Sequence, residues 1–284
     1  MQKLYHLPII KTIVYANVFI SLCAMAQLLV TYMVFPIPIN FKNNSFIFFV
    51  LLSTYLQYNM QRGYMIQQQN LLSERSHWVT YHKKILLVTV GLCLITVLFL
   101  CNSLSYTSIG IMVGAEILST VYYLPPFNFR KHGYIKPFLI SLVWVISCVA
   151  VPLLENNLLT PQSIWFMLSQ FLFVTSLCVL FDIKDADDDY MNGVNTYANK
   201  FGIKATKLFT IVLLCGFLIC SWLFKQEMNF QFLTSIVLAI VAIGCIALIN
   251  EKRHSFFYYL WIDGLLILQA VLYFVFSKTI FDCC

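Results

Sequence analysis

Long apolar runs follow one another through this sequence and limit the folds open to it. The first extends from Ile9 to about Phe35. A helix needs about 20 mostly apolar residues to cross a bilayer, because the hydrocarbon core is about 30 Å thick and each residue rises about 1.5 Å. The sequence therefore predicts an all-α integral membrane protein with about nine transmembrane helices. The expected helices are 9–35, 44–63, 84–101, 106–124, 137–155, 162–183, 205–224, 230–249 and 256–277.

Composition supports this reading and excludes a soluble fold. Hydrophobic residues make up 60% of the chain and charged residues 11%, whereas soluble domains have about 25% charged residues. The net charge of +6 is explained by membrane topology, so no nucleic-acid partner is expected, and no protein partner is predicted. Low-complexity stretches and a separate soluble domain are lacking. One polytopic domain is therefore expected over residues 1–284.

The basic residues predict how the chain is oriented in the bilayer. Positive charge is retained on the cytoplasmic side of membrane proteins. If the expected helices alternate in direction, fifteen of the 18 basic residues fall on one side: Lys3, Lys11, Arg62, Arg75, Lys83, Lys84, Arg130, Lys131, Lys136, Lys184, Lys200, Lys204, Lys207, Lys252 and Arg253. We therefore expect a protein of the cell membrane, with the N-terminus in the cytoplasm and the C-terminus outside. The long polar loops 64–83, 125–136 and 184–204 lie on the same cytoplasmic side, where function is expected.

An acidic cluster closes the sixth expected helix. On a continuous helix, Asp182, Asp185 and Asp189 would fall within about 60° of one another. Carboxylates crowded in this way repel one another unless cations lie between them. Magnesium (Mg2+) suits such a site because it prefers hard oxygen ligands and completes its shell with water and substrate phosphates. The alternative is a solvated helix end with no ligand.

Two segments resemble a known family. The spacing Asp182-x-x-Asp185-x-x-x-Asp189-x-x-x-Gly193-x-x-Thr196, followed by Phe201-Gly202, resembles the second aspartate-rich motif of the UbiA-type intramembrane prenyltransferases. The segment 122–131, with its two tyrosines, two prolines and basic pair, is similar to that family's Tyr-Ser-x-Pro-Pro segment. The expected nine-helix layout also matches the family.

The resemblance implies a helical bundle around a central cavity capped by cytoplasmic loops. It further implies transfer of a prenyl group from an isoprenyl diphosphate to a hydrophobic, aromatic or lipid acceptor, within the lipid bilayer and with magnesium. By this resemblance, Asp182, Asp185 and Asp189 are the catalytic, magnesium-binding residues. The residues expected to bind substrate are Asn59, Arg62, Tyr122, Arg130, Lys131 and Lys136.

The family's first aspartate-rich motif is eroded in this chain. If Asn59 is aligned with the asparagine of that motif, Met60, Gly63 and Gln67 replace its three carboxylates. The first metal site is therefore expected to be missing. Either Arg62, about 60° from Asn59 on the same helix, supplies the lost positive charge, or the chain is a non-catalytic relative that binds a polyprenyl diphosphate or another lipid anion. Arg62 is also explained by topology alone.

Two acidic residues lie inside expected membrane helices. Placing such a side chain at the bilayer centre costs about 2.5–3.5 kcal/mol on insertion scales, which makes Glu116 and Asp263 functional candidates. A paired structural role is the alternative for both. A carboxylate supplied to the eroded site by Glu74 or Glu116 would favour catalysis. A solute transporter is disfavoured because the prolines cluster at helix ends and do not break helices at mid-membrane.

Overall fold

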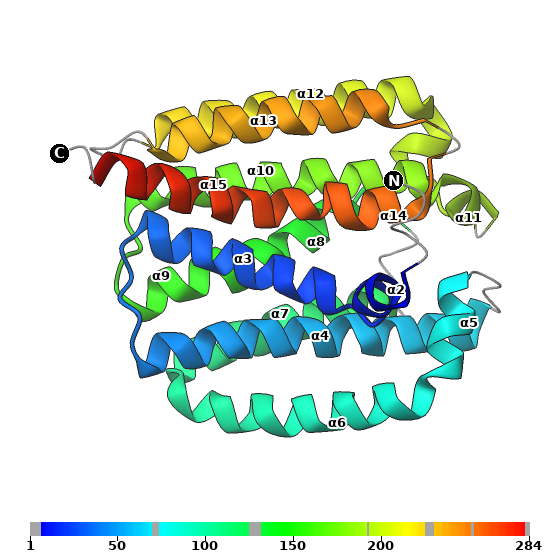
Figure 1. Cartoon of the computed structure of the whole chain (residues 1–284), viewed down its shortest axis with the longest axis horizontal. Helices are drawn as coiled ribbons and strands as arrows, with labels where there is room; N and C mark the ends of the chain where they lie inside the picture. The colour runs from blue at the N-terminus through cyan, green and yellow to red at the C-terminus, as the bar shows by residue number, and fades with distance from the viewer. Residues whose placement is uncertain are drawn as a thin grey trace.

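A computed structural model of the chain shows a bundle of helices (Figure 1). It describes residues 7–69, 74–124, 132–191, 193–224, 230–250 and 253–281, and no strand occurs within these ranges. This confirms the all-α fold class. The α-helices are α2 (Pro8–Tyr15), α3 (Val18–Val34), α4 (Phe41–Gln69), α5 (Glu74–Tyr81), α6 (Lys83–Leu100), α7 (Tyr106–Tyr123), α8 (Lys136–Val145), α9 (Val151–Glu155), α10 (Pro161–Lys184), α11 (Ala186–Met191), α12 (Tyr197–Leu223), α13 (Phe230–Leu248), α14 (Ser255–Phe257) and α15 (Gly264–Phe281). A 3-10 turn, η1 (Cys101–Ser103), and two π-helical turns, η3 (Ile146–Ala150) and η4 (Tyr258–Ile262), join some of them.

The expected membrane spans coincide with helices or with joined series of helices. In the described part of the chain, six helices are long and apolar enough to cross a membrane, or seven if the bent pair α2–α3 is one span. Helices α4 and α7 are not among them, because each mixes polar residues with its apolar ones. The chain is a multi-pass membrane protein, and the count of nine crossings stays a prediction.

The first expected helix is broken near its start. Helices α2 and α3 meet at an angle of 64°, and Asn17 between them has a left-handed backbone with φ of 64°. Asparagine tolerates this conformation better than most residues. Its side chain donates to Asn59 Oδ1 at 3.1 Å and accepts from Arg75 at 2.5 Å. The break is thus held by polar contacts to α4 and α5.

Helix α10 lies in the interior of the bundle. It packs against α8 and α12, and Phe166, Phe173 and Leu180 on it are buried. Three buried glutamines join three helices in the same core. Gln27 of α3 and Gln269 of α15 both donate to Gln170 Oε1 of α10. Hydrogen bonds of this kind stabilise helix pairs where water is excluded.

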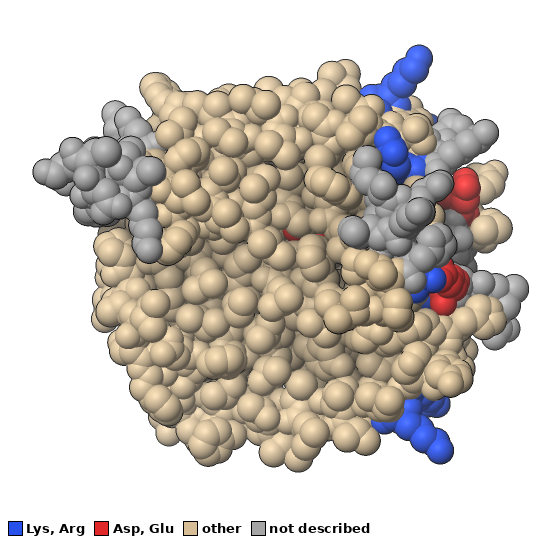
Figure 2. Space-filling model, viewed as in Figure 1, with Lys and Arg blue, Asp and Glu red and all other residues tan. Residues whose placement is uncertain are grey.

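Charged side chains gather at one end of the bundle. Figure 2 shows lysine, arginine, aspartate and glutamate gathered at the end that carries α5 and α11, while the side of the bundle in view consists almost entirely of other residues. Helix α6 on the outside exposes apolar side chains such as Ile95 and Phe99, as a lipid-facing helix does. We call the end with α5 and α11 the charged end.

Candidate functional site

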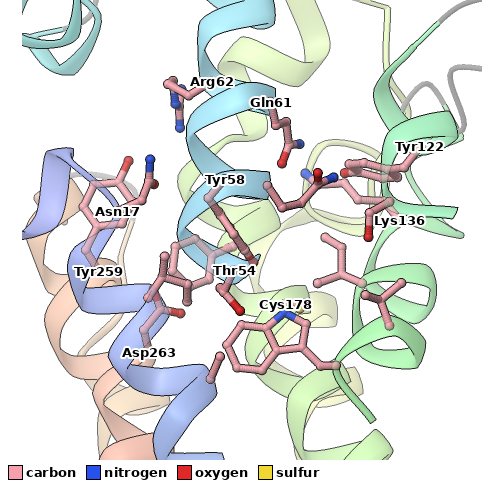
Figure 3. A pocket seen from close by; sticks show the side chains of 18 of the residues that line it. Asn17, Thr54, Tyr58, Gln61, Arg62, Tyr122, Lys136, Cys178, Tyr259 and Asp263 are labelled. Atoms are coloured by element: carbon pink, nitrogen blue, oxygen red, sulfur yellow. The ribbon is translucent and has the colours of Figure 1, made fainter. Parts of the chain in front are cut away.

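A cavity of about 710 Å³ reaches from the charged end into the bundle. Arg62, Lys184 and Asp185 lie in its wall towards the charged end, and apolar residues such as Val50 and Val143 line its interior. Figure 3 shows Arg62, Gln61 and Lys136 around one part of the cavity, with Tyr58, Thr54 and Cys178 further along it. The cavity therefore joins a charged region to an apolar one.

Two carboxylates of the acidic motif meet at one lysine. The Nζ atom of Lys136, at the start of α8, lies 3.1 Å from Asp182 Oδ1 and 3.1 Å from Asp189 Oδ2. Asp182 is fully buried, and apart from this ion pair neither of its carboxylate oxygens has a hydrogen-bond partner among the described residues. Asp189 and Lys136 are buried but line the cavity. The motif therefore carries a side-chain cation between two of its acidic groups.

The third carboxylate of the motif has a different partner. Helix α10 ends at Lys184, Asp185 caps it, and α11 begins at Ala186. The expected single acidic face on one continuous helix is therefore interrupted, because the chain turns at Asp185. Asp185 forms an ion pair with Lys184. Thus Asp182 and Asp189 share Lys136, whereas Asp185 pairs with Lys184.

A cluster of cations around Tyr259 borders the same cavity. Arg75 and Lys184 lie 5.0 Å and 5.1 Å from the centre of the Tyr259 ring, at distances where cations and aromatic faces attract. Lys184 Nζ also lies 3.4 Å from the Tyr259 hydroxyl. Sequence reasoning missed this cluster: Arg75 and Lys184 were explained by topology alone, and Tyr259 lies in an apolar run without a motif.

The residues expected to bind substrate are placed unequally. Arg62 and Tyr122 line the cavity. Asn59 instead supports the break between α2 and α3, because its amide donates to Ala16 O at 3.1 Å and to Tyr55 O at 2.8 Å. Lys136 is bound to two aspartates, as described above. Arg130 and Lys131 lie outside the described residues.

Other carboxylates also line the cavity. Glu74 is paired with Lys11 at 2.6 Å and accepts from the Tyr15 hydroxyl at 3.1 Å. The hydrogen bond from Lys11 holds the pKa of Glu74 below its usual range. Glu116 and Asp263 lie in the cavity wall as well. Within the described ranges, no group of three acidic, histidine or cysteine side chains converges to hold a metal ion.

One comparison with known proteins identifies a family. Residues 76–262 match the model of the UbiA prenyltransferase family, and no curated protein matches the chain.

Three solved structures are similar in fold. A UbiA homologue from Aeropyrum pernix K1 without ligand matches with a TM-score of 0.68 and 11% identity, covering 90% of this chain and 98% of that one. A digeranylgeranylglyceryl phosphate synthase matches with a TM-score of 0.58 and 16% identity over 96% and 98% of the two chains. A UbiA homologue from Archaeoglobus fulgidus bound to Cd2+ matches with a TM-score of 0.57 and 17% identity over 91% and 99%. At these identities the likeness shows the fold alone.

Proposed function

Because the chain belongs to the UbiA prenyltransferase family, we propose that it transfers a prenyl group from an isoprenyl diphosphate to a hydrophobic acceptor, either an aromatic compound or a lipid. The observation that carries this proposal is the cavity, which joins cationic side chains at the charged end to an apolar interior. An isoprenyl diphosphate has the same division, with an anionic head and an apolar tail. Such a substrate would lie with its head near Arg62 and Lys184 and its tail within the bundle.

The basic residues at the charged end suit a diphosphate. Arg62 and Arg75 present planar, permanently charged guanidinium groups to the cavity. Lys136 and Lys184 add ammonium groups from the starting end of α8 and the last turn of α10. Positive charge fixed in place before the reaction stabilises a leaving group as its negative charge develops. These side chains would therefore favour departure of the diphosphate.

The transfer exchanges one bond of the prenyl C1 atom for another. The bond between C1 and the diphosphate oxygen breaks, and its electron pair leaves with the diphosphate. The acceptor then forms a bond to C1 and releases a proton. Tyr58, Tyr122 and Trp144 line the cavity, and aromatic faces attract a cation that develops nearby. This wall would support positive charge at C1 until the acceptor attacks.

Magnesium held by Asp182, Asp185 and Asp189 is the cofactor that the sequence predicts, and it would supply positive charge to the diphosphate. The three carboxylates do not fit a shared centre here, because Lys136 lies between Asp182 and Asp189 while Asp185 pairs with Lys184. The stabilisation of the leaving group is therefore derived above from side chains. Relatives in this family typically use metal ions.

A non-catalytic binder of isoprenyl diphosphates is the second candidate. Loss of the first motif favours it, because Met60, Gly63 and Gln67 stand where three carboxylates are expected. Glu74 does not replace them, since it is paired with Lys11 and Tyr15. Both candidates would bind the isoprenyl diphosphate in the same cavity, but only the prenyltransferase would release diphosphate from it.

Purified protein in detergent, given radiolabelled isoprenyl diphosphates of increasing length, tests both candidates. The acceptor panel should include phenols and glyceryl phosphate lipids, since one structural neighbour is a digeranylgeranylglyceryl phosphate synthase. We expect diphosphate release that Arg62→Ala strongly lowers, because Arg62 presents its charge to the cavity, and that Asp187→Ala, a change at an exposed residue of α11, leaves intact. Binding without release would establish the non-catalytic relative. Absence of both binding and release would contradict the proposed substrate.

A further inference from the structure

Lys136 lies between two carboxylates of the acidic motif. Its Nζ atom is 3.1 Å from oxygens of two aspartates on different helices, α10 and α11. A cation between two carboxylates removes their mutual repulsion, whether it is a metal ion or an ammonium group. Lys136 also lines the cavity. Its ammonium group donates to Asp189 Oδ2 and forms an ion pair with Asp182, and an anionic ligand in the cavity would meet the same positive charge.

The backbone before α8 fixes this lysine in place. Gly133 lies so close to the segment before α12 that a Cβ atom on it would be 2.3 Å from Asn195 O. The rings of Tyr134 and Tyr197 meet edge to face with centroids 5.2 Å apart. The segment before α12 is in turn tied to Asp189, since Val194 N donates to Asp189 O at 2.8 Å. Lys136 and Asp189 are therefore held together by two packed backbone segments.

Basic side chains also lie at the third aspartate of the motif and at the eroded first motif. Asp185 is paired with Lys184. At the eroded first motif the chain offers no carboxylates, and Arg62 lies in the cavity wall instead. Both halves of the expected metal centre thus carry basic side chains.

We propose that Lys136 is a built-in counter-ion that takes the place of a divalent cation at the acidic motif, so that the chain binds its anionic ligand without divalent metal. The part that concerns the ligand rests on the function proposed above. Lys136 neutralises Asp182 and Asp189, and its side chain lines the cavity in which the diphosphate would bind. A divalent ion enters this site only by displacing the ammonium group.

Binding of Mn2+ to the purified protein, followed by electron paramagnetic resonance, tests the counter-ion directly. Wild-type protein should bind Mn2+ weakly, and Lys136→Gln should bind one ion at least about tenfold more tightly, because the ion no longer competes with an ammonium group. Lys84→Gln, an exposed lysine outside the cavity lining, is the charge-matched control and should behave as wild type. Equal, tight Mn2+ binding by wild type and Lys136→Gln would overturn the proposal.

A thermal-unfolding series covers the case in which Lys136→Gln folds poorly. Removing one partner of a buried ion pair leaves uncompensated charge, so the variant should melt at a lower temperature than wild type. Added Mg2+ should restore its melting temperature while leaving wild type and Lys84→Gln unchanged. The triple change Lys136→Gln, Asp182→Asn, Asp189→Asn should recover stability and bind no Mn2+. A destabilised Lys136→Gln that Mg2+ does not rescue would count against the counter-ion role.

Binding of a non-hydrolysable isoprenyl diphosphate analogue, with and without EDTA, separates this inference from the proposed function. We expect wild-type affinity to change less than about twofold with EDTA, because no bound metal is removed. Affinity that collapses in EDTA would overturn metal-free binding and leave the diphosphate substrate intact. If the analogue does not bind under either condition, the proposed function fails, and the Mn2+ titration still decides the role of Lys136.

Discussion

Asp263 places a carboxylate in the cavity wall directly after the π-helical turn η4. Its backbone N–H donates to Tyr258 O at 3.2 Å, five residues back, and such turns are frequent at functional sites. It forms no ion pair within 4 Å with the described residues, in contrast to Asp182, Asp185 and Asp189. An ionisable side chain is costly to place inside a membrane bundle, and such residues commonly mark functional sites.

We expect Asp263→Asn to stabilise the protein by up to about 1 kcal/mol, since it replaces a partly buried acid that has no ion-pair partner among the described residues with a neutral amide of the same size. The same variant should consume isoprenyl diphosphate more slowly than wild type. Thermal unfolding in detergent, together with the release assay, measures both effects. Asp187→Asn, exposed on α11, is the control and should change stability by less than about 0.5 kcal/mol. A destabilised Asp263→Asn would instead establish the paired structural role.

Among the elements, the contact between the segments preceding α8 and α12 aligns the acidic motif with its lysine. We expect Gly133→Ala to destabilise the protein by about 1–3 kcal/mol, because the new Cβ would lie 2.3 Å from a backbone oxygen that must move away. Thermal unfolding would report the loss.

Gly110→Ala in α7 is the matched control for this contact. No atom lies within 4 Å of its Cβ position, and alanine is favoured over glycine inside a helix by about 0.5–1 kcal/mol. Gly110→Ala should therefore be neutral or stabilising. Equal melting temperatures for the two variants would show that the segments separate freely, and Lys136 would then lose its fixed position.

The sequence predicted the helices well because their cause is local. The expected helix 162–183 corresponds to α10 (Pro161–Lys184), since the length and hydrophobicity of a run can both be read from neighbouring residues. The break at Asn17 was not predicted, because one polar residue inside an apolar run does not distinguish a bend from a buried hydrogen bond. Helix α12 begins at Tyr197, before its apolar run, where Thr196 caps it by accepting from Asn199 N.

The candidate site could be predicted only in part. The spacing of nearby residues was enough to identify the acidic motif at Asp182, Asp185 and Asp189 and to show that the family's first aspartate-rich motif is lost. The bridge from Lys136 to Asp182 and Asp189 joins distant positions through packing of the segments around Gly133 and Asn195. No spacing rule encodes that contact. For the same reason Arg75 and Tyr259, which meet across the cavity mouth, carried no sequence signal.

For the whole molecule, the orientation in the membrane stays a prediction, and the fold shows which elements lie at each end of the bundle. Helix α2 lies at the charged end, and α15 runs to the opposite end (Figure 1). Only Lys42, Lys225 and Lys278 fall on the side opposite the other basic residues. The positive-inside rule therefore places the charged end, with the cavity mouth and the acidic motif, in the cytoplasm.

Reporter fusions test the orientation and the number of crossings together. We expect green fluorescent protein to fluoresce when fused before the N-terminus, and alkaline phosphatase to be active after the C-terminus or after Asn40, between α3 and α4. A phosphatase fusion after Tyr81 should be inactive and serves as the internal control. Opposite sides for the two termini require an odd number of crossings, such as seven or nine. Termini on the same side would match six spans. In that case α2–α3, α4 and α7 would not all cross the bilayer.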